Sequence, residues 1–307
     1  MPSANSIPTL IKNLFEHQVL SVMIILAMLL PSMAVSRNKL VYVHKERSLQ
    51  PGEVILFEVR SPEPLRDLSV AAFGRTFSGF AEDDGRKWVA LVGIDLDTKP
   101  GRYSIRISAT GREGSVAAVD DTLAIAAKEF PTRKLTVDEK YVSPPADVLA
   151  RIEKERERVN GIFAHASPDR IWQGQFINPV PGKVISAFGK RSMYNGRLRS
   201  SHTGVDFRGA VGTPIRAPNA GIVVLAEDLY YSGKTVILDH GQGLYSYLGH
   251  MSAFSVKEGD RVEKGDLVGK VGATGRVTGP HLHWTIRLAG SRIDPISLVD
   301  LLRIPPK

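Results

Sequence analysis

Gly-Pro-His-Leu-His-Trp, at positions 279–284, places two histidines one residue apart at the start of an apolar, β-branched run. A run of that composition is typical of a β-strand. Because side chains alternate between the two faces of a strand, His281 and His283 are expected to share a face. Two neutral imidazoles side by side suit a divalent metal ion, or one metal ligand beside one acid/base group. A pair of surface histidines on an edge strand would have the same spacing, so the rest of the sequence has to decide.

A second group of candidate ligands lies upstream, where Ser-His-Thr-Gly-Val-Asp at 201–206 carries His202 and Asp206 four residues apart. Gly204 and its β-branched neighbours disfavour a helix here. An extended stretch with a bend could still turn both side chains toward one centre. Two histidines and one carboxylate are a common ligand set of catalytic zinc, with the fourth position left for water.

Together with a lone histidine in Gly-His-Met-Ser at 249–252, these segments resemble the signature of the lysostaphin-type zinc endopeptidases that cut cell-wall peptidoglycan. That signature is His-x-x-x-Asp, then a lone histidine, then His-x-His, and the chain has all three in this order. Three flanking segments also fit, at 185–189, 212–214 and 272–275. The resemblance covers roughly residues 176–302. One departure concerns a tyrosine that the family often has two residues before the lone histidine: this chain has Leu248 there and Tyr247 one residue earlier.

The resemblance implies a division of roles among five residues. One zinc ion per chain would be held by three of them, His202, Asp206 and His283. His250 and His281 would not be ligands; they would act on the water and on the peptide carbonyl oxygen, as general base and as donors to the oxyanion. The implied activity is that of a zinc metalloendopeptidase that hydrolyses peptide bonds in peptidoglycan cross-links or stem peptides.

Two alternatives have to be weighed against this activity. A non-catalytic cell-wall-binding or regulatory protein could share the fold, but the presence of every ligand favours the enzyme. The segment 257–268 resembles the hairpins of lipoyl and biotinyl carrier domains, yet it has no lysine in a Met-Lys-like turn. A lipoyl or biotinyl carrier domain would also have no use for the four histidines and the aspartate of the candidate site. A further histidine, His240, precedes Gly241 at the expected end of a strand, and we expect it to be structural.

The pattern outside the site predicts an all-β fold class. Residues 175–303, the expected zinc peptidase domain, contain short β-rich segments punctuated by glycine, which predicts an antiparallel barrel or sandwich of the lysostaphin-type peptidase fold. Residues 36–131 contain short strands between turn residues, as in a small Greek-key sandwich of immunoglobulin type. Between them, residues 144–170 are expected to hold one linker helix, because apolar residues recur at helical spacing among alternating charges.

The first 34 residues are typical of a targeting segment. An apolar run at 19–30 is followed by small residues at Ser32 and Ala34, which fits a signal peptide cleaved after Ala34. Mass spectrometry of the exported protein should then show Val35 as its N-terminal residue. A retained signal anchor is the alternative, although the run is shorter than the ~20 residues of a bilayer span. In both cases we expect the protein to be exported, to the periplasm or the cell envelope. It would contact the membrane only if the N-terminal segment is retained, and then only through that segment.

Bulk properties narrow the choice of partner. The chain has 307 residues, enough for two domains, a net charge of +8 and no cysteine. The positive charge favours polyanions, among them acidic cell-wall polymers, and no nucleic-acid-binding motif is present. We therefore expect peptidoglycan as the partner and no nucleic acid. The lack of cysteine excludes disulfides, a cysteine zinc site and a lipoprotein anchor.

Overall fold

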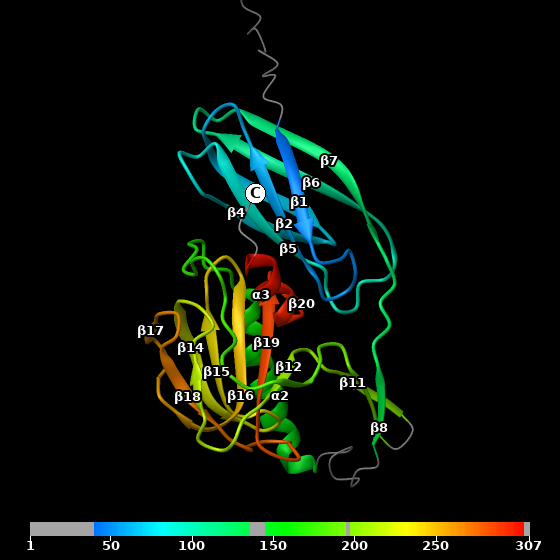
Figure 1. The fold of residues 1–307 in the computed structure, drawn as a ribbon, viewed down its shortest axis with the longest axis vertical. Helices are drawn as coiled ribbons and strands as arrows, with labels where there is room; N and C mark the ends of the chain where they lie inside the picture. Colours follow the sequence, from blue (N-terminus) through cyan, green and yellow to red (C-terminus); the bar gives the residue numbers. More distant parts are fainter. Residues whose placement is uncertain (1–39, 136–144, 195–196, 304–307) are drawn as a thin grey trace, which may run out of the picture. The chain divides into compact units, whose positions relative to one another are not determined.

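The computed structural model describes residues 40–135, 145–194 and 197–303, so the expected signal peptide lies outside the described residues. Strands make up almost all of the regular structure (Figure 1), and the helices of the described ranges are α2 (Ala146–Ala164) and α3 (Pro295–Arg303). Neither helix is long and apolar enough to cross a membrane. The predicted all-β fold class is confirmed.

The N-terminal strands form an immunoglobulin-like sandwich, as predicted. Its strands are β1 (Val41–Glu46), β2 (Val54–Arg60), β3 (Leu65–Ala72), β4 (Arg75–Ala81), β5 (Lys87–Gly93), β6 (Gly101–Gly111) and β7 (Val116–Ile125). They follow the order β1-β2-β5-β4-β3-β6-β7 with antiparallel pairing, and β4 pairs with both β3 and β5. This is the immunoglobulin order of a four-stranded and a three-stranded layer. Alternation along the strands turns Phe57, Leu68 and Ile107 inward, where all three are fully buried.

The chain leaves the sandwich through a short three-stranded sheet. β8 (Thr132–Leu135) pairs in parallel with β10 (Arg191–Tyr194), which pairs antiparallel with β11 (Arg197–Ser201). The remaining strands are β9 (Val184–Ser186), β12 (Val205–Arg208), β13 (Pro214–Arg216), β14 (Gly221–Leu229), β15 (Gly233–Asp239), β16 (Leu244–Phe254), β17 (Arg261–Val262), β18 (Leu267–Val271), β19 (His281–Leu288) and β20 (Ser291–Ile293).

These ten strands form one antiparallel sheet that folds back on itself. Its main path is β17-β14-β15-β16-β19-β12-β9, while β18 joins β13 to β16 and β20 lies beside β19. Alternation divides the central strands between two faces. Leu248 and Trp284 belong to the main apolar core on one face, and Ile237 and Tyr245 to a smaller core on the other.

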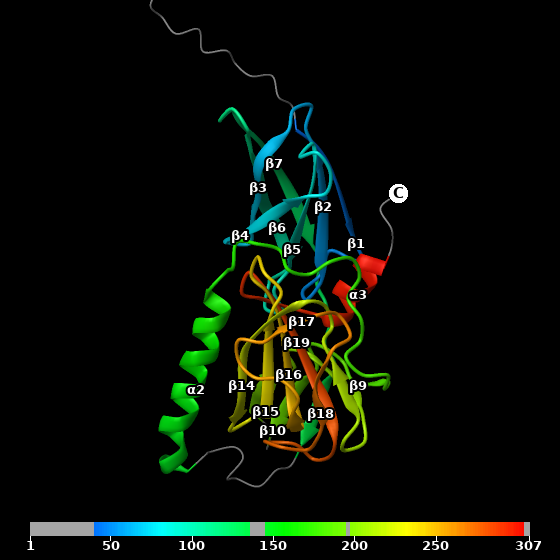
Figure 2. The ribbon, with the colours of Figure 1, turned by 90° about the vertical axis from the view of Figure 1, so that its left-hand side faces the viewer.

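Helix α2 packs on the face that carries the smaller core and runs beside β14 (Figures 1 and 2). Val159, Ile162 and Phe163, spaced three and four residues apart, contact that core. Arg158 forms an ion pair with Glu227 of β14 at 2.9 Å. The prediction of one amphipathic helix with a packed stripe is therefore confirmed, although none of its residues is fully buried.

Contacts join the sandwich and the ten-stranded sheet within one unit. A single apolar core contains residues of both, and Trp172 packs edge-on against Phe80, with ring centroids 5.3 Å apart. Arg292 of β20 donates from its backbone N–H and its guanidinium to the carboxylate of Asp95. The division of the chain at 131 and 175 stays a prediction.

Candidate metal centre

Strand pairing brings two of the three expected ligands together. Asp206 of β12 lies directly opposite His283 of β19 in the antiparallel register, so both side chains project from the same face. His202 precedes β12 and is turned toward them by a bend at Gly204. A Cβ atom at residue 204 would lie 2.2 Å from the carbonyl oxygen of Trp284, so only glycine lets the bend approach β19 this closely. The structure thus has the extended stretch with a bend that the sequence allowed.

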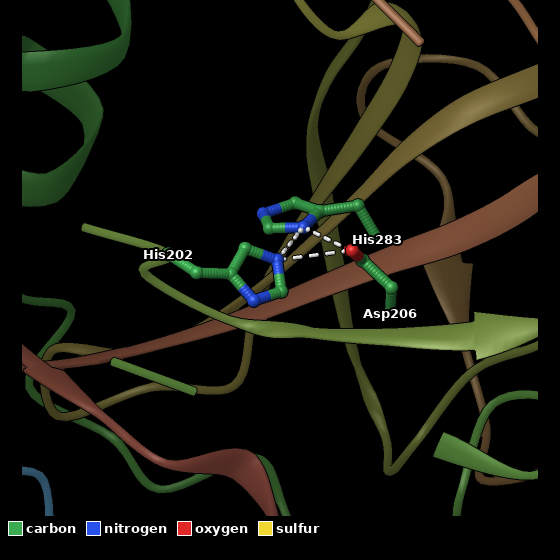
Figure 3. Close-up of side chains that lie close together, drawn as sticks. All are labelled: His202, Asp206 and His283. Carbon is green, nitrogen blue, oxygen red and sulfur yellow. Dashed lines mark hydrogen bonds and ion pairs between the residues drawn. The ribbon is translucent and has the colours of Figure 1, made fainter. Parts of the chain in front are cut away.

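The three side chains converge on one point (Figure 3). Nε2 of His202 lies 2.9 Å from Oδ1 of Asp206 and 3.0 Å from Nδ1 of His283. Nδ1 of His283 lies 2.9 Å from the same Oδ1. Two imidazole nitrogens and a carboxylate oxygen thus share one small volume, as the ligands of a single ion do.

The outer hydrogen bonds of both imidazoles fit metal ligation. Nδ1 of His202 lies 2.9 Å from the carbonyl oxygen of Ala187, an acceptor, which favours the tautomer with the proton on Nδ1 and the lone pair on Nε2. Nε2 of His283 lies 2.9 Å from Oγ1 of Thr285, to which it can donate, leaving the lone pair on Nδ1. Three converging lone pairs repel one another, and a cation between them relieves that repulsion. The donor set fits zinc, whose histidine ligands usually have such outer partners.

The electrostatics of the site favour the forms that ligate a metal. Burial alone would raise the pKa of Asp206, but the two imidazole nitrogens of His202 and His283, each 2.9 Å from its Oδ1, outweigh burial and hold this pKa well below its usual range. Burial lowers the pKa of His283, although the nearby carboxylate of Asp206 acts in the opposite direction. At neutral pH the carboxylate is therefore ionised and the His283 imidazole is neutral.

His281 and His250 lie beside this cluster with a different orientation. Nδ1 of His281 donates to the carbonyl oxygen of Gly279 at 2.8 Å, and Nδ1 of His250 to that of Thr274 at 2.9 Å. The two ring centroids are 4.8 Å apart. With the proton on Nδ1, the lone pair of each ring lies on Nε2, the nitrogen that makes no hydrogen bond within the described part of the chain. Burial, with a smaller effect of His283, lowers the pKa of His250 to about 4, so this ring is neutral at pH 7.

The position of His250 depends on an unusual backbone conformation. By simple alternation along β16, His250 would share the core face with Leu248, which is fully buried. Its φ of 64° lies in the left-handed region, which breaks the alternation and turns the ring toward the site. Non-glycine residues rarely adopt this conformation, and those that do cluster at functional sites.

Tyr247 is the tyrosine that contacts the site, one residue before the position where the family often has one. Leu248 faces the core, whereas Tyr247 lies beside His283, with ring centroids 6.3 Å apart, and donates to the hydroxyl of Ser232. The sequence left the role of a tyrosine open. Strand alternation from Gly249, which pairs with His283, would have placed Tyr247 on the site face.

His240 lies away from the cluster and is fully buried. Its Nδ1 donates to the carbonyl oxygen of Ala220 at 2.7 Å, and its Nε2 accepts from the hydroxyl of Ser246 at 2.8 Å. Ser246 in turn accepts from the indole N–H of Trp284 at 3.2 Å. Both ring nitrogens are satisfied inside the core, as expected for a structural histidine.

Acid should destabilise the native protein through His240. Burial lowers the pKa of this imidazole to about 4, whereas a histidine in the unfolded chain has a pKa of about 6.5. Between these values the unfolded state binds a proton that the native state does not, so the free energy of unfolding falls as the pH is lowered. The expected loss reaches about 3 kcal/mol near pH 4. Urea unfolding with a chelator present should show a weaker pH dependence for His240→Gln; equal slopes would contradict this.

The three proposed metal ligands and the two histidines beside them line one groove with a volume of about 880 Å³. These residues are His202, Asp206, His283, His250 and His281. Its wall also includes Val159 and Phe163 of α2 and three cationic side chains, those of Lys190, Arg276 and Arg287. The sequence analysis missed Arg287. The signal was available in the two-residue period of β19, because residue 287 follows 281, 283 and 285 on the same face.

Comparison with known proteins identifies similar sequences and folds. The model of peptidase family M23 matches residues 200–295. The DD-carboxypeptidase/endopeptidase Mpg of Neisseria meningitidis serogroup B is 38% identical over 119 residues, 38% of this chain and 27% of that protein. The peptidoglycan DD-endopeptidase ShyA of Vibrio cholerae serotype O1 is 35% identical over 119 residues, 38% of this chain and 28% of that protein. This chain thus spans about a quarter of the length of both relatives.

A solved structure is similar over much more of the chain. The crystal structure of a Pseudomonas aeruginosa protein assigned to peptidase M23 is 34% identical and has a TM-score of 0.65. The match covers 82% of this chain and 95% of that one. The likeness therefore extends well beyond the segment that contains the five site residues.

Proposed function

The chain belongs to peptidase family M23, and from this premise we propose that it is an exported zinc metalloendopeptidase that hydrolyses peptide bonds in peptidoglycan cross-links or stem peptides. The observation that carries the proposal is the convergence of His202, Asp206 and His283 beside two further histidines, His250 and His281, in one groove. Relatives named as peptidoglycan DD-endopeptidases support the substrate class. The targeting segment expected at residues 1–34 supports export to the periplasm or cell envelope.

The five residues would divide the chemistry between them. His202, Asp206 and His283 would hold the ion through the three atoms that converge. A zinc ion held there would act as a Lewis acid. It would lower the pKa of water, so that a hydroxide-like nucleophile is available near neutral pH, and it would polarise the peptide carbonyl. Nε2 of His250 or His281 would accept the proton of the attacking water as a general base. The same atom then carries an N–H, which can donate to the developing oxyanion or to the leaving amine.

The fixed geometry of these two histidines supports their role. Each ring is held by its Nδ1 hydrogen bond to a backbone carbonyl, so Nε2 keeps one orientation and one tautomer. A pre-oriented base or donor needs no reorganisation when charge develops in the transition state. The left-handed backbone of His250 adds to this, because it fixes a side-chain direction that the strand would not otherwise give.

Digestion of purified murein by the zinc-loaded protein, with products identified by mass, tests the proposal. We expect new amino and carboxyl termini within the peptide part, and loss of this activity on removal of zinc by a chelator. Asp206→Asn offers a control of nearly unchanged size that replaces one ligand. Stoichiometric zinc with binding to murein but no bond cleaved would instead support the non-catalytic wall-binding alternative.

A further inference from the structure

Arg287 lies on the same face of β19 as the two site histidines. It is four residues beyond His283, so the strand rise places the two Cα atoms about 13 Å apart. Its side chain lines the groove that contains the proposed metal ligands. The groove therefore has a cationic side chain that is remote from the reacting atoms but lines the same groove.

The guanidinium of Arg287 has no partner among the described residues. It makes no hydrogen bond or ion pair with them, and its Nε atom is buried without an acceptor. Arg292, which pairs with Arg287 across β19 and β20, engages the carboxylate of Asp95 through both of its oxygens. Burial, and then the charges of Arg292 and Arg75, lower the pKa of Arg287 to about 10, which still leaves it charged at neutral pH.

The contact that Arg287 does make is with an aromatic ring. Its Cζ atom lies 5.2 Å from the ring centroid of Phe163 on α2, in a cation–π arrangement. The ring covers the guanidinium without supplying an acceptor or a counter-charge. A partly buried cation that lacks a counter-ion is unfavourable unless a ligand provides one.

The lining of the groove indicates the charge of that ligand. Among the described lining residues, Asp206 alone carries a carboxylate, and the proposed function assigns it to the metal ion. Lys190, Arg276 and Arg287 are all cationic, and Arg276 lies over the ring of Tyr231 at 4.3 Å. An excess of positive charge along a groove attracts anionic ligands. The planar, forked guanidinium is suited to bind a carboxylate through two parallel hydrogen bonds.

We propose that Arg287 is a specificity-determining residue that binds a free carboxylate of the peptide substrate, at a position two or more residues from the bond that is cut. This rests on the proposed function, because it deepens the description of the substrate to a peptide with a free carboxylate. The carboxylate supplies the acceptors and the counter-charge that the guanidinium lacks. A carboxamide at that place would lack the charge and could accept only one of the two parallel hydrogen bonds.

The test compares two forms of one stem peptide, with free carboxylates and with carboxamides in their place. Binding of the uncross-linked stem peptide to the zinc-loaded protein gives the affinity, and cleavage of the cross-linked dimer gives kcat/KM. The wild type should prefer the free-carboxylate form by about 10- to 100-fold, the range expected for hydrogen bonds between charged groups. Arg287→Gln should lose this preference, mainly through weaker binding of the free form, while Arg287→Lys should keep part of it.

Two matched variants separate this role from a structural one. Phe163→Leu removes the ring but keeps the cation, and should retain the preference. Arg276→Gln removes another positive charge from the same groove, and should also retain it. Overturning results would be an undiminished preference in Arg287→Gln, or an equal loss of preference in Arg276→Gln, which would assign the effect to the overall charge. Zinc content and thermal stability of each variant show whether the site has stayed intact.

The two measurements also distinguish failure of this inference from failure of the proposed function. A wild type that cleaves neither dimer while it binds the free-carboxylate peptide through Arg287 would contradict the endopeptidase and support the carboxylate site. Cleavage of both dimers at equal rates, with equal affinity for both peptides, would support the endopeptidase and overturn the role of Arg287.

Discussion

His283→Ala should lower bound zinc far below one ion per chain and reduce murein cleavage by at least about 10³-fold. Nδ1 of His283 lies within 3.0 Å of both other ligand atoms, so its loss leaves His202 and Asp206 as a two-residue site. A third ligand then has to come from water, which is held less firmly than a side chain fixed in the strand. If the metal ion supports the fold, the midpoint of thermal unfolding should fall as well.

Metal content by atomic emission, beside murein-cleavage rates, measures this effect. Thr285→Val is the graded control, because Oγ1 of Thr285 is the outer partner of His283 at 2.9 Å. Loss of such an outer partner should lower zinc affinity by about 10- to 100-fold without removing the ligand. Full zinc occupancy and wild-type turnover in His283→Ala would exclude His283 as a ligand.

Much of the site could be predicted from the sequence because its signals are local. The two-residue period of a strand placed His281 and His283 on one face, and Gly204 with its β-branched neighbours argued against a helix between His202 and Asp206. The resemblance supplied the order of the elements. Sequence patterns do not give the pairing of β12 with β19, which joins residues 77 positions apart. That long-range register is what turns the ordered motifs into one cluster.

Two features of the site, the backbone conformation of His250 and the burial of Arg287, depend on tertiary structure. The left-handed backbone of His250 interrupts the alternation of β16, and the apolar and polar pattern of the strand does not reveal this. Burial of Arg287 requires α2 to pack on the groove face of the sheet, where Phe163 covers the guanidinium. The periodicity of the helix predicted one packed stripe, but not the surface against which that stripe packs.

Substitution of His281 should affect murein cleavage but not zinc binding, in contrast to substitution of His283. They share a face of β19, yet Nδ1 of His283 points at Asp206, whereas Nδ1 of His281 donates to the carbonyl oxygen of Gly279. Nε2 of His281 lies 3.8 Å from Oδ1 of Asp206, farther than either proposed histidine ligand. His281→Ala should therefore keep near-stoichiometric zinc while murein cleavage falls roughly 10²–10⁴-fold, the range for a positioned acid/base group.

A double variant tests whether His250 and His281 serve the same transition state. Their ring centroids lie 4.8 Å apart, so both can act on one reacting centre. The effects of substituting residues that act as a unit are not additive. The double variant His250→Ala/His281→Ala should therefore lose activity by a smaller factor than the product of the two single-variant losses. Zinc content has to stay near one ion per chain in all three variants for the comparison to hold. Loss of zinc from His281→Ala, with zinc retained by His283→Ala, would reverse the assignment of ligand and acid/base residue on this strand.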